Sequence, residues 1–319
     1  MEEEIKLPIG RGGKVIYFNE AKAIYIKSII EKNKLNLNGL KIALDLAYGA
    51  TTTVAPEIFS NLNSSLTLFN EKPDGEKVNV GCGSTNPEFL SRKIKENGFD
   101  LGFSFDGDGD RVIAFDEKGD IVDGDMIMFI LAKYLKIPSI VITVMSNFGL
   151  KVLLNKYGIR FYEVPVGDRN VLYKMVEVNA SLGGEQSGHI IYLPQSKTGD
   201  GIITSLLLLK VLVEQNKPLS ELNKEFIKYP QILRNIKVRD KNKVMKDEIF
   251  FKEVSLWNEK LNGKGRILVR PSGTENLIRI MVEGEEEKEI LEIVDCLEDL
   301  LKKRLTQNFS LGDEEEGSQ

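Results

Sequence analysis

The acidic stretch FSFDGDGDRVIAF, residues 103–115, places the strongest constraint on the fold and chemistry of this chain. Asp106, Asp108 and Asp110 alternate with glycines, and Arg111 follows them. Apolar runs on both sides are typical of a turn between two buried strands. Carboxylates crowded into one short loop repel one another unless a cation lies among them, and hard oxygen ligands suit Mg²⁺ or Ca²⁺. We therefore predict a divalent-metal site formed by the three aspartates.

Other structures also contain clustered aspartates. A solvated acidic turn is the usual explanation of a lone D-x-D, but three alternating aspartates between strand-like flanks disfavour it. An EF-hand loop needs glycine at its sixth position, which is Arg111 when counted from Asp106, so that loop is excluded. A phosphatase with an aspartate nucleophile also places D-x-D after a strand, and the spacing alone leaves that alternative open.

Short apolar strands alternate with helical segments over the first two thirds of the chain. Residues 21–32 and 87–97 have helical patterns, whereas 40–46 and 101–105 are continuous apolar runs. This alternation predicts parallel α/β units. The acidic stretch then lies at the carboxyl end of a strand, where open α/β sheets bind their ligands.

Changes in this pattern predict the domain organisation. The fold class is α/β, with two consecutive α/β domains followed by a small α+β C-terminal domain, because strands flank a helix after residue 230 and an amphipathic helix ends the pattern. The predicted boundaries are a lead-in over 1–20, α/β domains over 21–121 and 122–229, an α+β domain over 230–308, and a disordered acidic tail over 309–319.

Composition excludes several classes of protein. A net charge of -5 without a basic stripe argues against a nucleic-acid partner. The longest apolar stretch, residues 202–213, is interrupted by Lys210 and is shorter than the ~20 residues that span a bilayer, so no membrane partner is expected. The acidic start MEEEIK is unlike a signal peptide. Cys82 and Cys296 give neither a disulfide framework nor zinc spacing, which predicts a cytoplasmic location.

The hexapeptide RPSGTE lies between two predicted strands. Arg270 supplies a guanidinium fork, Ser272 and Thr274 supply hydroxyls, and Gly273 lets backbone amides approach an anion. Arg279 adds charge from the following strand. Taken alone the hexapeptide also fits an ordinary polar hairpin.

A second polar loop, GEQSGH, combines a carboxylate, a hydroxyl and an imidazole. Glu185 and Ser187 have the chemistry to bind sugar hydroxyls, and His189 can act as an acid or base. The loop VGDR adds Asp168 and Arg169 at the end of another strand. Together with the acidic stretch, these loops predict metal-assisted handling of a phosphorylated, polyhydroxylated substrate.

In this order, the motifs resemble those of the α-D-phosphohexomutases, most closely the bacterial phosphoglucosamine mutase branch. The match runs from Gly39 to Lys303 and comprises LKIALDLAYGAT, GCGSTNPE, DGDGDR, DGDMIMFILAKYL, TVMSNFGL, VGDR, GGEQSGHII, KTGDG, RPSGTE and LIRIMVEG. GEQSGH, TGDG and VGDR are more similar to the glucosamine branch than to the mannose and glucose branch.

The resemblance implies a four-domain enzyme that interconverts glucosamine 6-phosphate and glucosamine 1-phosphate. In such enzymes a phosphoserine donates its phosphoryl group, which gives a bisphosphorylated sugar that reorients and returns the other phosphate. The implied roles follow the motifs. Mg²⁺ is bound by Asp106, Asp108 and Asp110. The catalytic residues are Arg111, beside the phosphoryl group, and His189, near the residues that hold the sugar hydroxyls. The phosphorylated hexosamine is bound by Asp168, Arg169, Glu185, Ser187, Arg270, Ser272, Gly273, Thr274 and Arg279.

The resemblance also implies a first domain whose active-site serine lies in a Ser-His-Asn-Pro-like loop before Ala21. Residues 1–20 contain no such loop, and the single histidine, His189, follows a glycine. We therefore expect three of the four domains, without the nucleophile and the fourth metal ligand, as in a truncated gene, a split gene or a gene with a wrongly assigned start. Such a chain is inactive alone or is completed in trans by a separate first-domain chain. The alternatives are a non-catalytic phosphosugar or metal sensor, and phosphomannomutase or phosphoglucomutase specificity.

Overall fold

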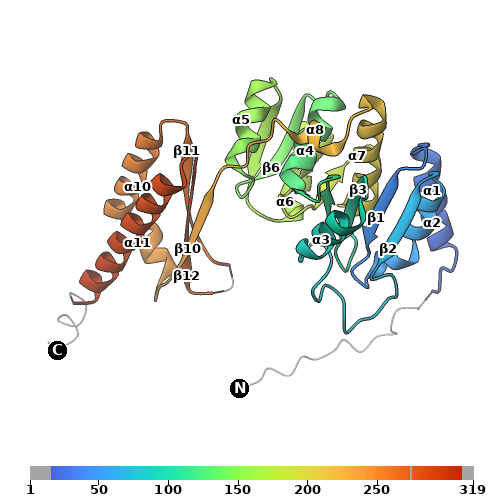
Figure 1. Ribbon diagram of the computed structural model, residues 1–319. Helices are drawn as coiled ribbons and strands as arrows, with labels where there is room; N and C mark the ends of the chain where they lie inside the picture. The colour runs from blue at the N-terminus through green and yellow to red at the C-terminus, as the bar shows by residue number, and fades with distance from the viewer. Residues whose placement is uncertain (1–15, 274, 311–319) are drawn as a thin grey trace, which may run out of the picture.

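The computed structural model describes residues 16–273 and 275–310, which form three structural units along the chain (Figure 1). Most of the predicted lead-in, Thr274 of the predicted phosphate loop, and the predicted acidic tail from residue 311 lie outside the described residues. The units are two α/β domains and a C-terminal α+β domain, so the predicted fold class is confirmed.

The first α/β domain is built on a five-stranded sheet of order β2-β1-β3-β4-β5. Strand β1 pairs in parallel with β2 and β3, while β3 and β4 form an antiparallel hairpin. The acidic loop is the turn of that hairpin. In chain order the elements are α1 (Ala21–Lys32), β1 (Lys41–Asp45), η1 (Ala50–Thr53), α2 (Ala55–Ser60), β2 (Ser65–Phe69), α3 (Glu88–Asn97), β3 (Leu101–Phe105), β4 (Val112–Phe115) and β5 (Ile121–Val122).

The second α/β domain repeats this arrangement, with strand order β7-β6-β8-β9. Strand β6 pairs in parallel with β7 and β8, and β8 and β9 form an antiparallel hairpin. The loop from Glu185 to His189 is therefore topologically equivalent to the acidic loop. The elements are α4 (Gly124–Tyr134), β6 (Ser139–Thr143), α5 (Phe148–Lys156), β7 (Arg160–Val164), α6 (Asp168–Val178), β8 (Leu182–Gly184), β9 (Ile190–Tyr192), α7 (Gly201–Gln215) and α8 (Leu219–Asn223).

The two α/β domains share one hydrophobic core. Helix α7 is apolar on almost every side, which is typical of a helix buried inside a protein. It packs on α4 and β9 of its own domain and on β4 of the first domain. Buried residues of both sheets and of α4 and α7 belong to the same cluster, including Phe103, Phe105, Phe129 and Leu206. The two hairpin loops are therefore held in a fixed relation to each other.

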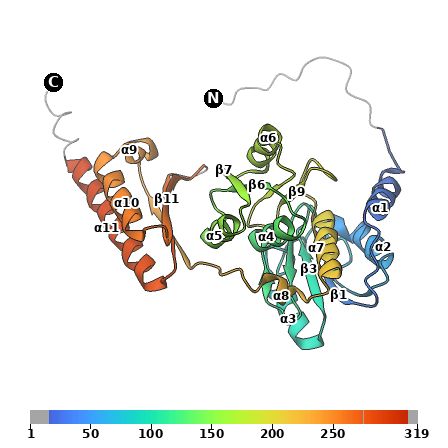
Figure 2. The same cartoon turned by 90° about the horizontal axis from the view of Figure 1, so that it is seen from above.

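The C-terminal domain is a three-stranded antiparallel sheet of order β10-β12-β11, covered on one face by α10 and α11 (Figures 1 and 2). Its core is a separate cluster, and the apolar positions expected on one face of the last helix are all buried there: Ile290, Ile293, Val294, Leu297 and Leu301. The elements are β10 (Gln231–Lys237), α9 (Lys241–Met245), α10 (Glu248–Leu261), β11 (Gly265–Pro271), β12 (Leu277–Gly284) and α11 (Glu287–Ser310).

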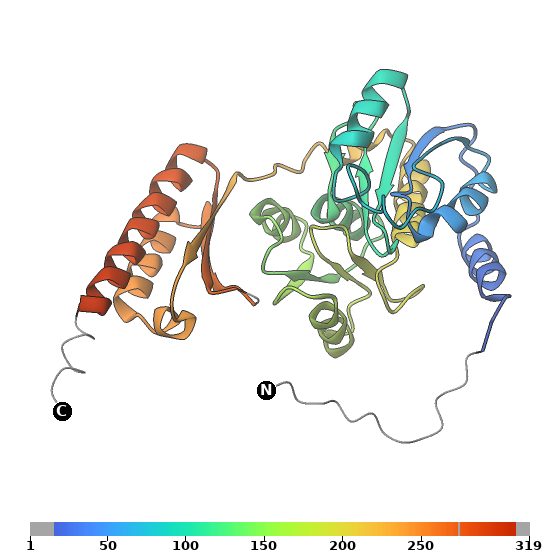
Figure 3. The same ribbon diagram turned by 90° about the horizontal axis from the view of Figure 1, so that it is seen from below.

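An extended segment between α8 and β10 leads into the C-terminal domain (Figure 3). Beside it, polar side chains connect this domain to the second α/β domain. Glu283, which is 0% exposed, accepts hydrogen bonds from Arg266 Nε at 2.6 Å and from Asn147 Nδ2 at 3.1 Å. Arg266 also donates to the carbonyl oxygen of Ser146 at 2.7 Å. We call Ser146, Asn147, Arg266 and Glu283 the polar junction.

None of the helices in residues 16–273 and 275–310 combines the length and apolar character needed to cross a membrane.

Candidate functional site

The acidic loop, residues 106–111, and the Glu185–His189 loop meet through their backbones. Arg111 and His189 form an isolated antiparallel bridge between the two domains, and Val112 N donates to Gly188 O at 3.1 Å. Gly188 has φ +93°, and a Cβ atom there would lie 2.2 Å from Val112 O. Because only glycine tolerates both the positive φ and the close approach, this residue allows the loops to touch.

Asp106 shapes the acidic loop from within. Its side chain is 1% exposed; Oδ1 accepts from Gly109 N at 3.0 Å and from Arg111 N at 3.1 Å, and Oδ2 accepts from Arg111 Nε at 3.0 Å. Gly109 has φ +78°, which lets the chain turn back over the carboxylate. Burial, together with the nearby Asp110 carboxyl group, raises the pKa of Asp106 even though Arg111 opposes the change.

Asp110 connects the acidic loop to His189. Asp110 Oδ2 lies 3.1 Å from His189 Nδ1, while Asp110 Oδ1 is buried without a hydrogen-bond partner and has Arg111 Nε at 3.7 Å. His189 is 5% exposed, and its Nε2 is also buried without a hydrogen-bond partner. A Cβ atom at Gly199 would lie 2.4 Å from the imidazole ring, so Gly199 packs against it.

The donor set is compatible with a hard cation at this loop. Asp110 is close enough to Asp106 to raise the pKa of the Asp106 carboxyl group. Oδ1 of Asp110 is an unpartnered carboxylate oxygen, which is a suitable ligand for such a cation. Asp108 is exposed. Within the described residues no three His, Cys, Asp or Glu side chains converge in a metal-ligating group. The three-aspartate metal site therefore stays a prediction.

The side chain of Glu185 connects the VGDR loop to the Glu185–His189 loop. Its Oε1 accepts from Gly167 N at 2.9 Å, and Ser187 Oγ donates to its Oε2 at 3.4 Å. Asp168 and Arg169 follow directly in the first turn of α6, and both are exposed. The VGDR loop and the Glu185–His189 loop thus form one polar edge beside the acidic loop.

A cavity of about 340 Å³ opens beside the acidic loop. Its lining includes Asp108 and Asp110 together with Tyr25, Thr51 and Asp200, to which the sequence analysis assigned no role. Tyr25 Oη donates to Asp200 Oδ2 at 2.9 Å, and burial with this contact raises the pKa of the tyrosine. Asp200 also accepts from Ile203 N at 2.9 Å and caps α7. The available signal was an aspartate directly before an apolar helix.

Asp45 is a second polar group to which the sequence analysis assigned no role. It ends β1, is 0% exposed, and accepts hydrogen bonds from Ala47 N, Asn70 Nδ2 and Gly83 N at 3.1, 2.8 and 2.6 Å. It thereby fixes three loops at the carboxyl end of the first sheet. A carboxylate at the end of the apolar run KIALD was the signal for it.

Two arginines face each other in the C-terminal sheet. Arg270 on β11 and Arg279 on β12 are direct cross-strand partners, a placement that is destabilising for like charges without an anion. Burial and the neighbouring Arg279 lower the pKa of Arg270, and Arg279 Nε is buried without a partner. In the part of the chain that the structure describes, neither guanidinium forms an ion pair with a carboxylate.

Among its described residues, the loop between these strands offers the hydroxyl of Ser272 and an open position at Gly273. Ser272 is 3% exposed; its N donates to Leu277 O at 2.9 Å, and its Oγ accepts from Glu275 N at 3.3 Å. Over residues 16–273 and 275–310, no acceptor takes the hydroxyl proton of Ser272, so this proton is available for an anion. A Cβ atom at Gly273 would contact nothing within 4 Å, so this position is open.

The structure brings together the acidic loop, the Glu185–His189 loop and the VGDR loop. Over residues 16–273 and 275–310, no hydrogen bond or ion pair joins them to the Arg270–Arg279 pair. The predicted site therefore has two parts, one shared by the α/β domains and one on the C-terminal domain.

Comparison with protein families identifies the class of protein. Residues 23–119 match the family model "Phosphoglucomutase/phosphomannomutase, alpha/beta/alpha domain II", residues 123–229 match domain III, and residues 233–300 match the C-terminal domain. The chain belongs to the phosphoglucomutase/phosphomannomutase family of phosphohexomutases.

Among individual relatives, the chain is similar to bacterial phosphoglucosamine mutases. It is 47% identical over 312 residues to that of Natranaerobius thermophilus, an alignment covering 95% of this chain and 70% of the relative. The phosphoglucosamine mutase of Carboxydothermus hydrogenoformans is also 47% identical, over 310 residues, with the same coverage.

Solved structures agree on the fold. A phosphoglucomutase/phosphomannomutase family protein from Burkholderia thailandensis matches with a TM-score of 0.74 at 22% identity, covering 88% of this chain and 64% of that one. The N-acetylphosphoglucosamine mutase of Aspergillus fumigatus, solved in complex with GlcNAc-6P and magnesium, matches with a TM-score of 0.71 at 17% identity, covering 87% and 69%. The chain thus spans about two thirds of the length of these proteins.

Proposed function

We propose that this chain provides the metal, sugar and distal phosphate sites of a phosphoglucosamine mutase, which interconverts glucosamine 6-phosphate and glucosamine 1-phosphate. The observation that carries the proposal is the contact between the acidic loop and the Glu185–His189 loop, through the Arg111 and His189 bridge and the pairing of Asp110 with His189. The similarity to phosphoglucosamine mutases supports the choice of substrate.

At the acidic loop, the residues are arranged to handle a transferring phosphoryl group. Asp106, Asp108 and Asp110 would hold Mg²⁺, which when bound supplies neutralisation of the phosphoryl charge. Arg111, anchored on Asp106, contributes a guanidinium beside the same position. His189 orients Asp110 through Nδ1. Its other ring nitrogen, Nε2, would accept or donate the proton.

The sugar and its second phosphate would be bound on the other loops. Glu185 and Ser187 bind sugar hydroxyls, with Asp168 and Arg169 at the adjacent edge. Arg270, Arg279 and the hydroxyl of Ser272 bind the phosphate that is not transferred, with Gly273 and Thr274 in the same loop. An anion there would relieve the repulsion between the facing guanidinium groups.

We propose that the phosphoryl donor is a phosphoserine on a first domain, since residues 1–319 contain no Ser-His pair. A phosphoserine on a first-domain polypeptide transfers its phosphoryl group to a sugar hydroxyl, whose proton passes to a base. The bisphosphorylated sugar then returns its other phosphoryl group to the serine. We propose that such a domain supplies the phosphoryl donor and that the enzyme works in the cytoplasm.

The test is conversion of glucosamine 6-phosphate with Mg²⁺ and a hexose bisphosphate primer, using this chain alone and with the first domain of a phosphoglucosamine mutase. Turnover is expected only after the domain is added. Turnover by the chain alone would refute the need for a donor from outside. No turnover in either case would refute the mutase, and retained sugar-phosphate binding would then favour a non-catalytic binding protein.

The metal site is tested in the same reconstituted enzyme. Asp108→Asn is expected to reduce turnover at saturating Mg²⁺ by about 10²-fold or more, because charge stabilisation of the phosphoryl group is lost. Asp120→Asn, which changes an exposed aspartate in the turn between β4 and β5, is the matched control and should leave turnover unchanged. Equal turnover of the two variants would contradict the assignment. If the enzyme converts glucose phosphate or mannose phosphate faster than glucosamine phosphate, the substrate assignment changes to that sugar phosphate.

A further inference from the structure

Lys241 contacts both ends of the loop between β11 and β12. It is the first residue of α9, and its Nζ donates to Ser272 O at 2.8 Å and to Glu275 O at 3.1 Å. These two carbonyl groups flank Gly273 and the residue that follows it. One ammonium group therefore connects the backbone of Ser272 to that of Glu275, from a helix that lies more than thirty residues earlier in the chain.

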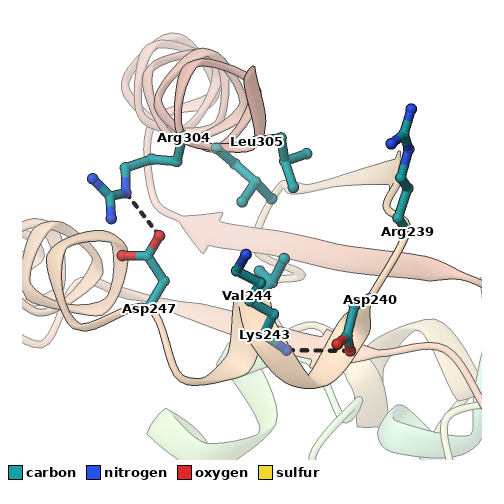
Figure 4. A pocket seen from close by; sticks show the side chains of 8 residues that line it. Arg239, Asp240, Lys243, Val244, Asp247, Arg304 and Leu305 are labelled. Carbon is teal, nitrogen blue, oxygen red and sulfur yellow. Dashed lines mark hydrogen bonds and ion pairs between the residues drawn. The ribbon is translucent and has the colours of Figure 1, made fainter. Parts of the chain in front are cut away.

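The helix that carries Lys241 is anchored independently of this loop. Asp240 caps α9 by accepting hydrogen bonds from Asn242 N at 2.8 Å and from Lys243 N at 3.3 Å, and Val244 is buried in the domain core. Figure 4 shows a cavity of only about 30 Å³ between α9 and α11, lined by Lys243, Val244 and Leu305 among others. Lys241 therefore extends from a fixed support.

Further along the chain from Lys243, the C-terminal helices are also tied together. Asp247 caps α10 and accepts from Arg304 Nε of α11 at 2.7 Å, as Figure 4 also shows. The support for α9 is thus continuous with the core of the C-terminal domain.

An anion-binding loop has to present donors and keep its carbonyl oxygens away, since these carry partial negative charge. Ser272 has its hydroxyl proton available, as described above, and the facing Arg270 and Arg279 supply the charge. The carbonyl groups of Ser272 and Glu275 are the acceptors that would compete for those donors or repel the phosphate. Lys241 binds both of them and uses two of its three donor hydrogens to do so.

We propose that Lys241 is a positioning residue that fixes the Ser272–Glu275 loop in the form that binds the phosphate of a sugar phosphate. The inference rests on the proposed function, because it adds a residue to the distal phosphate site. Lys241 acts through the loop backbone, and its role is separate from the charge of the two arginines. Loss of its hydrogen bonds should weaken phosphate binding without unfolding the domain.

Calorimetric titration of this chain with glucosamine 6-phosphate tests the proposal. Lys241→Met keeps the aliphatic stem but removes the donors, and is expected to raise the Kd about tenfold. Lys241→Arg, whose guanidinium fork can reach two carbonyl groups, should restore most of the affinity. Lys243→Met is the matched control: it lies on the same helix, its side chain is exposed, and its Kd should equal that of the unchanged chain.

Amide hydrogen exchange over residues 270–280, without ligand, gives a second and independent measurement. The Lys241→Met variant should exchange faster at Leu277 and Glu275, and Lys243→Met should not. Unchanged exchange and an unchanged Kd in Lys241→Met would overturn the proposal. If the unchanged chain does not bind the sugar phosphate while Lys241→Met still accelerates exchange, the proposed function fails at this site and the loop-fixing role of Lys241 stands.

Discussion

The two contacts between domains in this chain differ in polarity: one is apolar and the other is polar. The α/β domains meet through a shared apolar core around α7, with glycines that let their backbones touch. The C-terminal domain has its own core and meets the second α/β domain through the polar junction of Ser146, Asn147, Arg266 and Glu283.

This difference has a physical consequence for each contact. Close-packed apolar surfaces resist displacement because any movement opens voids. Hydrogen bonds at a boundary can instead be exchanged for bonds to water at a small net cost, about 1 kcal/mol each. The α/β pair should therefore behave as one cooperative unit, whereas the C-terminal domain should be able to separate from it and change its orientation.

Removing a large side chain from the shared core should have the largest effect on stability. Phe129 is 0% exposed and packs against Phe226 and Tyr157. Phe129→Ala is expected to cost about 3–5 kcal/mol in the free energy of unfolding of both α/β domains together. Far-ultraviolet circular dichroism during urea unfolding should show their joint transition move to lower urea. Two separate α/β transitions would contradict a shared core.

The same variant has an internal control in the C-terminal domain. The single tryptophan of the chain, Trp257, lies on α10, so its fluorescence reports on that domain. The fluorescence midpoint should not move in Phe129→Ala. Leu297→Ala, which removes a side chain that is 0% exposed from the C-terminal core, should move the fluorescence midpoint and leave the α/β transition in place.

Breaking the polar junction should have a smaller effect. Glu283→Ala leaves Arg266 and Asn147 without their shared acceptor, and is expected to cost about 3 kcal/mol. The Trp257 transition should occur at lower urea, and small-angle scattering should show a larger radius of gyration as the domain separates. Glu285→Ala, at an exposed neighbouring position, should change stability by less than about 0.5 kcal/mol. Equal effects of the two variants would show that the junction does not hold the domain.

A titration beneath the junction should make stability depend on pH. Asp125 is 0% exposed and accepts a hydrogen bond from Asn147 N at 2.7 Å. Burial and the neighbouring Asp123 raise the pKa of Asp125 from 3.8 to about 7, although Lys228 opposes this change. Because the folded state holds the proton more tightly, stability falls as pH rises from about 4 to about 7 and is then level.

Asp125→Asn should remove that dependence. The unchanged chain is expected to lose roughly 1.4 kcal/mol per pH unit relative to the variant over this range. Urea unfolding of both proteins at pH 5, 6, 7 and 8 measures the difference. A constant difference across this series would mean that Asp125 does not titrate there.

Local pattern was sufficient to predict most of the fold. The helix over Ala21–Lys32 and the strand over Leu277–Gly284 have the predicted bounds, because strong apolar periodicity and flanking turn residues act within a few residues. The short helix α9 was not predicted, since five residues are too few to show a helical period. Its aspartate cap at Asp240 was the available signal.

The site was predictable only where its residues are close in sequence. The acidic loop and the Glu185–His189 loop were both found from their composition, but nothing in either segment predicts the Arg111 and His189 bridge. Lys241 was missed because its acceptors are backbone carbonyl groups, which every residue has. Glu283 was missed because it lies in an apolar strand and its partner Asn147 is 136 residues away.

The glycine contact at Gly188 limits how this molecule can move. Since the acidic loop and the Glu185–His189 loop share backbone hydrogen bonds, any displacement of one carries the other with it. Relative movement of large parts of the described chain is therefore expected between the α/β pair and the C-terminal domain, which are linked by the segment between Asn223 and Gln231.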